Sequence, residues 1–351
     1  MTVVYLHIGT DKTGTTAIQE ALSKSTRILR AHGILYPRTG RIGHAHYLLS
    51  SALGFTSPPE QSTAAIRARI PALQKRLANE IRRSRADAVI ISSEMFVNEQ
   101  DVALARELLA PFDTRIIVYL RRHDKWWESA YRESVKRLPS PPWESSAGSF
   151  IDFHQRRNSM RARYRHLITR WADQFGTEAL IVRPFEKQQN QPDIVTDFLR
   201  AADQPELAES GLIQPPLANL ALDNQTMSLI DIYQRSRVPP RIRRKLITHA
   251  MDAPLGTAHS PTLSPARRRQ LIADNAEDYE WIARTFLGRT DGKLFLDPPP
   301  RDDDAWAEPG PPDPRIVAEH TMSALTEPRF TRKNASRLGR GAYYRIRMAG
   351  R

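Results

Sequence analysis

The chain has no cysteine among its 351 residues. This absence excludes disulfide frameworks, cysteine nucleophiles and cysteine-ligated zinc or iron–sulfur sites. Long apolar runs are missing too, because stretches such as residues 116–120 fall far short of the ~20 residues that a membrane-spanning helix needs. No basic segment followed by an apolar signal core stands at the start. The sequence therefore predicts a cytoplasmic protein without a transmembrane segment.

Charge is unbalanced: 52 lysines and arginines face 39 acids, for a net charge of +13. Residues 329–351 contain seven arginines, one lysine and no acid, and so supply eight of these charges. A second basic cluster comprises Arg235, Arg237, Arg241, Arg243, Arg244 and Lys245. Such charge indicates an anionic partner, such as a polyanion, a nucleotide phosphate or an anionic surface that the basic tail contacts. No motif for specific nucleic-acid binding accompanies it.

Hydrophobic and charged residues make up 40% and 26% of the chain, which is typical of a globular protein. Short β-branched runs at residues 2–8, 88–91, 115–120 and 179–182 alternate with stretches of helical periodicity. Alternating strands and helices predict an α/β fold with a parallel sheet and helices on both faces. After about residue 184 the pattern is helical throughout.

Helices are expected at residues 64–84, near residues 102–109 and from Asp124 onwards, and residues 139–149 are expected to form a mobile loop. Residues 297–328 are rich in proline and aspartate, which predicts a linker without packed elements. We therefore divide the chain into a domain over 1–296, this linker, and a basic tail over 329–351.

The segment Gly9-Thr10-Asp11-Lys12-Thr13-Gly14-Thr15-Thr16 lies between the first expected strand and the first expected helix. Loop amides and a helix N-terminus converge at such a point and favour an anion. Lys12 adds a positive charge, and Thr13, Gly14, Thr15 and Thr16 add hydroxyl and backbone donors. The order differs from the nucleoside-triphosphate loop, in which the lysine follows the second glycine.

This K-T-G-T-T order resembles the 5′-phosphosulfate loop of the sulfotransferases, which transfer a sulfo group from 3′-phosphoadenosine 5′-phosphosulfate on a P-loop-type α/β fold. The family also has an arginine at a strand end and a serine eight positions later, which bind the 3′-phosphate. Arg121 and Ser129 match this signature, with Arg122 as the adjacent alternative. Further similarity to bacterial members lies at residues 171–176, 182–186 and 197–199. A third family contact, an R-K-G triplet, has no clear match.

Sulfo transfer to a hydroxyl or amine needs a general base near the sulfur. Glu94 follows the expected strand at 88–91, and the resemblance places the general base of the reaction at a comparable strand end. His44 and His46 are the rival candidates, because an imidazole needs little tuning to accept a proton near pH 7. Lys12 would neutralise charge on the leaving oxygen.

The resemblance implies a sulfotransferase that uses 3′-phosphoadenosine 5′-phosphosulfate and requires no metal, with a carbohydrate or glycolipid as the expected acceptor. The pair His44 and His46 has no third ligand at a metal-binding spacing. Two alternatives remain: a P-loop kinase or nucleotide hydrolase that uses ATP and magnesium, and a basic polyanion-binding protein.

Overall fold

The computed structural model describes residues 2–56, 61–157, 162–216, 222–257 and 260–326. The chain forms two compact units, each assembled from three separate segments. The ranges of unit 1 are Met1–His123, Asn158–Ala218 and Gln270–Pro299; those of unit 2 are Asp124–Arg157, Asn219–Arg269 and Pro300–Arg351. The range 1–296, which the sequence assigns to one domain, therefore contains parts of both units.

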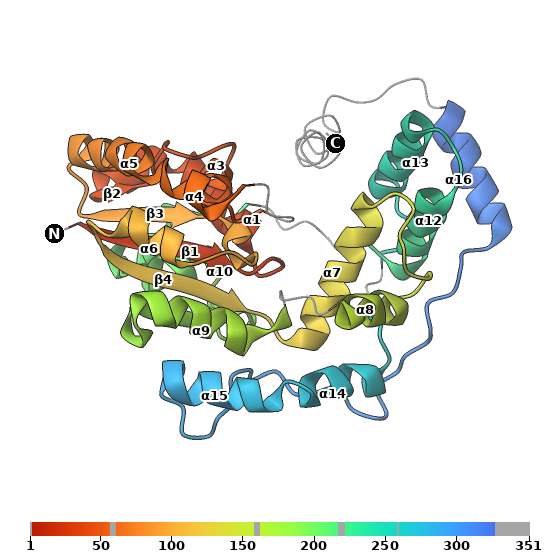
Figure 1. Ribbon diagram of the computed structural model, residues 1–351. Helices are drawn as coiled ribbons and strands as arrows, with labels where there is room; N and C mark the ends of the chain where they lie inside the picture. Colours follow the sequence, from red (N-terminus) through yellow and green to blue (C-terminus); the bar gives the residue numbers. More distant parts are fainter. Residues whose placement is uncertain (1, 57–60, 158–161, 217–221, 258–259, 327–351) are drawn as a thin grey trace. The chain divides into compact units, whose positions relative to one another are not determined.

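A five-stranded parallel sheet forms the centre of unit 1, with the strand order β2-β3-β1-β4-β5 (Figure 1). The strands are β1 (Val3–Gly9), β2 (Ile34–Leu35), β3 (Ala88–Ser92), β4 (Asp113–Leu120) and β5 (Leu180–Pro184). The predicted α/β fold with a parallel sheet and a helical second half is confirmed. The edge strand β2 was not predicted, because two residues are too few to show a period.

Both faces of the sheet are buried, as the continuous apolar runs of the strands require. Val4, Leu6 and Ile8 of β1 belong to one core cluster, which also contains residues of the helices over 70–84, 103–109, 164–175 and 276–287. Tyr5 points the other way, into a second cluster with residues of the helices over 15–24, 26–31, 194–201 and 205–209. Alternation of side chains along a strand therefore gives two apolar layers, one on each face.

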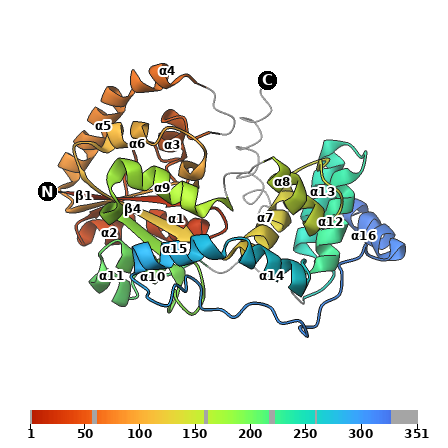
Figure 2. The ribbon, with the colours of Figure 1, turned by 60° about the horizontal axis from the view of Figure 1, so that its bottom comes forward.

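The helices of unit 1 lie on either side of these strands (Figures 1 and 2). They are α1 (Thr15–Lys24), α2 (Thr26–Ala31), α3 (Tyr47–Ala52), α4 (Thr63–Arg67), α5 (Ile70–Ser84), α6 (Ala103–Leu109), α9 (Tyr164–Phe175), α10 (Ile194–Ala201), α11 (Pro205–Glu209) and α15 (Ala276–Leu287), with short 3-10 turns at Glu94–Val97 and Thr177–Ala179.

Unit 2 is helical in its described residues. Its helices are α7 (His123–Arg137), α8 (Ala147–Arg156), α12 (Asn224–Arg235), α13 (Pro240–Asp252) and α16 (Pro314–Thr326). The residues of α14 (Pro265–Ala273) are divided, with those up to Arg269 in unit 2 and those from Gln270 in unit 1. α16 packs on α13, and its buried His320 contacts Tyr233 of α12.

Three expectations need correction. The helix expected over 64–84 is two helices, because α4 ends before Pro71 begins the first turn of α5. The loop expected over 139–149 ends at Ser146, whose hydroxyl accepts a hydrogen bond from the amide of Ser149 and caps α8. The linker expected over 297–328 contains α16, which buries His320 and Ala324 despite its polar surroundings. The basic tail at 329–351 lies outside the described residues.

Within the described ranges, no helix combines the length and apolarity needed to cross a bilayer.

Candidate functional site

The loop between β1 and α1 lies at the carboxyl edge of the sheet, where ligands bind in open α/β folds. Gly9, the last residue of β1, leads into this loop with φ +89°, and a Cβ there would lie 2.8 Å from the Cα of Glu94. Thr10 ties the loop to the neighbouring strand, because its hydroxyl donates to the Tyr119 carbonyl at 3.0 Å. Thr13 donates to the Thr10 carbonyl at 2.5 Å and closes the turn.

The N-terminus of α1 opens onto this turn. Gly14 is the N-cap residue, with φ 77°, and its carbonyl accepts the amides of Ala17 and Ile18. The amides of Thr15 and Thr16 precede these bonds, so they have no acceptor within the helix. Thr15 is buried and Thr16 exposed. The predicted donor residues therefore surround one helix start, which attracts negative charge.

Lys12 lies at the tip of this loop in the left-handed backbone region, with φ 69°, and is half-buried. Its carbonyl accepts a hydrogen bond from Nη1 of Arg121 at 2.9 Å. Arg121 directly follows β4, and its guanidinium lies over the ring of Phe185, 5.5 Å from the centroid. The structure therefore brings two of the predicted cations, Lys12 and Arg121, to the same loop.

Arg122 occupies a different environment. It is buried, and Nη1 donates to the carbonyl oxygens of Asp297 and Pro298 at 2.7 and 3.1 Å. These bonds anchor the segment after α15 within unit 1. Arg122 thus has a structural role, and Arg121 is the stronger candidate for an anion contact.

Ser129 lies on α7 in unit 2, whereas Arg121 belongs to unit 1. It is partly exposed on its own helix. The pairing of the two residues stays a prediction.

Glu94 follows β3 and is partly buried beside the loop. Its two carboxylate oxygens each accept a hydrogen bond: Oε2 from Nε2 of Gln19 at 2.9 Å, and Oε1 from the hydroxyl of Tyr47 at 2.6 Å. Gln19 comes from α1 and Tyr47 from α3, so two helices hold this carboxylate. Each oxygen keeps a second lone pair, with which it can accept a proton.

Gln19 also links Glu94 to the interior of the sheet. Its Nε2 lies 3.2 Å from the hydroxyl of Ser92, which in turn lies 2.8 Å from Nδ1 of His7 on β1. Burial lowers the pKa of His7 to about 3, so this imidazole is neutral. Sequence analysis missed Gln19 and Tyr47, because a polar residue inside an amphipathic helix carries no signal of its own.

His46 is fully buried at the start of α3. Its Nδ1 accepts the Ser92 amide at 3.1 Å, and its Nε2 lies 3.0 Å from the Pro37 carbonyl. Burial lowers its pKa to about 4. Both ring nitrogens are therefore occupied by backbone groups, so His46 holds the β2–α3 segment to β3 and is poorly placed to accept a substrate proton.

His44 is half-buried, and its Nδ1 lies 2.5 Å from the hydroxyl of Ser23 on α1. Its carbonyl accepts the hydroxyl of Tyr36 at 2.6 Å. Glu94 and His44 are therefore both available as candidates, with Glu94 the one in contact with Gly9. Among the described residues, no group of three or more His, Asp or Glu side chains is arranged to hold a metal ion.

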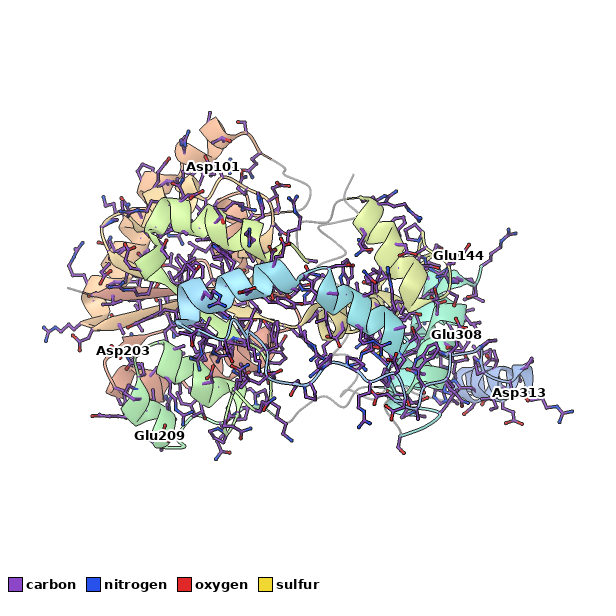
Figure 3. All side chains as sticks on the ribbon, turned by 90° about the horizontal axis from the view of Figure 1, so that it is seen from below. Asp101, Glu144, Asp203, Glu209, Glu308 and Asp313 are labelled. Atoms are coloured by element: carbon purple, nitrogen blue, oxygen red, sulfur yellow. The ribbon has the colours of Figure 1, made fainter. Side chains whose placement is uncertain are left out.

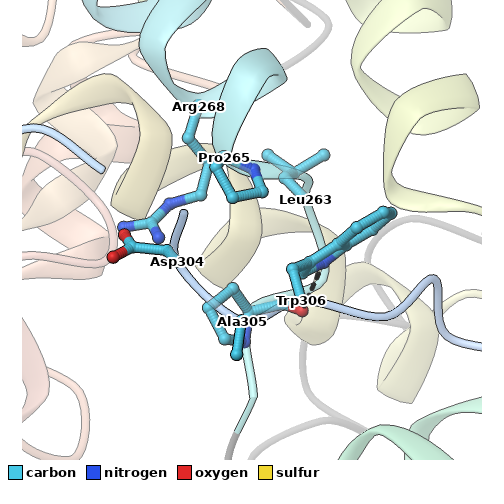
Figure 4. Close-up of a pocket in the computed structure, with 7 residues that line it drawn as sticks. Leu263, Pro265, Arg268, Asp304, Ala305 and Trp306 are labelled. Atoms are coloured by element: carbon cyan, nitrogen blue, oxygen red, sulfur yellow. Dashed lines mark hydrogen bonds between the residues drawn. The ribbon is translucent and has the colours of Figure 1, made fainter. Parts of the chain in front are cut away.

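Unit 2 contains a cavity of about 260 Å³ (Figure 4). Its lining is Pro261, Leu263, Pro265, Arg268, Asp304, Ala305 and Trp306. Nε1 of Trp306 donates to the Pro261 carbonyl at 3.2 Å, which fixes the indole. Arg268 binds the fully buried carboxylate of Asp124 at 3.1 Å, so its charge is compensated. None of the residues predicted from sequence lines this cavity, and Trp306 lies in the expected linker.

Comparison with known proteins adds little about chemistry. An uncharacterised protein of Archaeoglobus fulgidus is 25% identical over 208 residues, which cover 57% of this chain and 54% of the relative. The chain thus spans about half the length of that curated relative. No family model matches the chain, and no solved structure matches it.

Proposed function

We propose that the protein is a sulfotransferase that moves a sulfo group from 3′-phosphoadenosine 5′-phosphosulfate to a hydroxyl or amine, with a carbohydrate or glycolipid as acceptor. The observation that carries this proposal is the position of the Lys12 loop. It joins the central strand to α1, is hydrogen-bonded by Arg121 and touches Glu94 at Gly9. Cations, amide donors and a carboxylate thus meet at one edge of the sheet.

The donor set suits the sulfonated nucleotide. A phosphosulfate presents oxyanions that accept hydrogen bonds, and the first amides of α1, the Thr15 and Thr16 side chains and the Lys12 ammonium are donors. The planar guanidinium of Arg121 suits a terminal phosphate. The nucleotide would supply an activated sulfo group to this site.

In the proposed reaction, the acceptor oxygen or nitrogen forms a bond to sulfur while the bridging S–O bond breaks. The electron pair of that bond leaves on adenosine 3′,5′-bisphosphate. The acceptor proton moves to a carboxylate oxygen of Glu94, which Gln19 and Tyr47 keep in one orientation. Lys12 offsets the negative charge that develops on the leaving oxygen. His44 is the alternative proton acceptor.

A kinase or nucleotide hydrolase is the main alternative, because the same loop position also serves ATP. Thermal unfolding separates the two. Adenosine 3′,5′-bisphosphate in EDTA raises the melting temperature of a sulfotransferase, and ATP with magnesium leaves it unchanged. The opposite pattern would favour the kinase. A screen with radiolabelled sulfo donor over hydroxylated sugars, lipids and small phenols then identifies the acceptor.

The polyanion-binding alternative depends on the basic excess. Exposed acids occur in both units, among them the residues labelled in Figure 3, Asp101, Glu144, Asp203, Glu209, Glu308 and Asp313. The described surface therefore carries both signs of charge, and eight positive charges belong to residues 329–351. Polyanion binding is accordingly proposed as an accessory property of the tail.

A further inference from the structure

Arg41 lies in the segment between β2 and α3 and is half-buried. Its Nη1 atom is buried and has no hydrogen-bond partner among the described residues. The buried Arg122, in contrast, donates to two carbonyl oxygens. Buried charged groups in proteins are normally paired, since removal from water without a partner is costly. Arg41 as a residue is only half-buried, so an anion from outside the chain can approach the guanidinium whose Nη1 atom lacks a partner.

Aromatic rings hold this guanidinium in place. Its central carbon lies over the ring of Tyr36, 5.2 Å from the centroid. The edge of His46 contacts the same ring, with centroids 4.7 Å apart, and the Tyr36 hydroxyl donates to the His44 carbonyl. Ring faces attract a cation but do not accept its N–H groups as an oxyanion does. The Tyr36 ring thus holds the Arg41 guanidinium in position, while its Nη1 atom donates no hydrogen bond.

The same segment leads to the candidate base. Tyr47, at the start of α3, donates to Glu94 at 2.6 Å. Burial is the main cause of the raised pKa of the Tyr36 phenol; Arg41 counteracts this rise and Glu94 adds to it. The guanidinium and the carboxylate therefore act on one phenol. Arg41 and Glu94 therefore both lie near Tyr36.

We propose that Arg41 binds an anionic group, a carboxylate or a sulfate ester, on the acceptor substrate. This inference depends on the proposed function and narrows its acceptor to an acidic glycan or acidic glycolipid. Arg41 is then a specificity-determining residue that favours acidic acceptors over neutral ones.

Inorganic sulfate provides a test that needs no acceptor. Lys12→Ala removes the main anion-binding charge of the loop, and Lys12→Ala/Arg41→Gln also removes the second site. We expect sulfate to raise the melting temperature of the single variant in a saturable way, and this saturable part to be lost in the double variant. Non-specific stabilisation by sulfate affects both equally. Equal responses would overturn the Arg41 site.

Arg38→Gln is the matched control, because Arg38 is exposed in the same segment and binds Glu80 through its backbone amide. In the Lys12→Ala background it should leave the sulfate response intact. Without sulfate, Arg41→Gln should change stability little, since the side chain is half-buried, its Nη1 atom has no hydrogen-bond partner, and only the contact with the Tyr36 ring is lost. A clear loss of stability together with an unchanged sulfate response would identify Arg41 as purely structural.

The acceptor class is tested with a uronic-acid oligosaccharide and its carboxyl-reduced counterpart. Arg41→Gln should raise KM for the acidic acceptor on the order of tenfold or more, as expected for lost charge-assisted hydrogen bonds, with little change for the neutral one. Equal KM effects on both would overturn the proposed specificity. If adenosine 3′,5′-bisphosphate fails to stabilise the wild type while the Arg41-dependent sulfate response persists, the proposed function fails and the anion site stands.

Discussion

Lys12 is the residue on which the proposed chemistry depends most. Lys12→Ala should lower sulfo transfer on the order of 10²-fold or more, the loss seen when one preorganised charge-stabilising donor is removed. Turnover with radiolabelled sulfo donor measures it. Lys24→Ala is the control, because Lys24 is an exposed lysine at the end of α1, the helix that follows the Lys12 loop, and is paired with Glu20. Equal rates for the Lys12 variant and the wild type would remove this lysine from the mechanism.

The buried His46 predicts how stability changes with pH. Its pKa is about 4 in the folded state and about 6.5 when unfolded, so at intermediate pH the unfolded chain binds a proton that the folded chain does not. Stability is complete above pH 6.5 and declines as the pH falls towards 4. At pH 5 this residue should cost ~2 kcal/mol relative to pH 7.

Denaturant unfolding at pH 7 and pH 5 measures this loss. His46→Gln should reduce the difference between the two pH values, even though it weakens the protein by losing bonds to Ser92 and Pro37. His32→Gln should leave the difference unchanged, because His32 is exposed. A His46 variant with the full wild-type difference would contradict the assignment. Burial lowers the pKa of His7 to about 3, so His7 also contributes to the loss of stability at low pH.

At the level of elements, the close approach of the β1–α1 loop to the residue after β3 organises the site. Gly9→Ala places a methyl group 2.8 Å from the Glu94 Cα at a positive φ. It should destabilise the fold by roughly 2 kcal/mol or more and abolish the adenosine 3′,5′-bisphosphate response. Gly43→Ala is the control. Gly43 has φ 59° and open space where the methyl group would lie, so this variant reports the cost of backbone strain alone. Similar losses of stability in both variants would show that the close approach of Gly9 to Glu94 is not the cause.

Sequence patterns predicted the elements that have a strong apolar period. The four longer strands and the helices from Ala103 and His123 lie close to their expected positions, because burial on one or two faces sets their pattern. The break between α4 and α5 depends on one proline, and β2 depends on its backbone pairing with β3. Neither feature produces a recognisable period in the sequence. The Lys12 loop and the strand ends after β3 and β4 were predicted as neighbours, since parallel strands bring their carboxyl ends to one edge.

What the sequence did not reveal is how individual polar atoms are used. His44 and His46 are two residues apart, yet one is half-buried beside Ser23 and the other is enclosed by backbone groups. Arg121 and Arg122 differ in the same way. Adjacent residues of one type acquire different environments only through tertiary packing, which no local pattern encodes.

For the whole molecule, the interleaved segments decide where the chain tolerates truncation. Ending it at residue 328 retains α16, whereas ending it at 296 removes this helix and the carbonyl oxygens of Asp297 and Pro298 that bind Arg122. The shorter chain should unfold at a lower temperature and at lower denaturant concentration. Coincident unfolding curves for both truncations would restore the linker interpretation.

Residues 329–351 carry eight positive charges, and their removal tests the origin of polyanion affinity. The truncated protein should lose salt-dependent binding to heparin, since release of counterions from a polyanion scales with the cations that engage it. Its response to adenosine 3′,5′-bisphosphate should stay as in the full chain. Heparin binding that survives the truncation would assign this affinity to the body of the protein.

The two outer strands of the sheet bear on how the protein behaves at high concentration. β2 offers only two residues, and β5 ends in a proline, which has no amide hydrogen. Neither border presents a long row of backbone groups to which a strand of another molecule can add. Concentrated preparations should accordingly resist fibril formation through these borders.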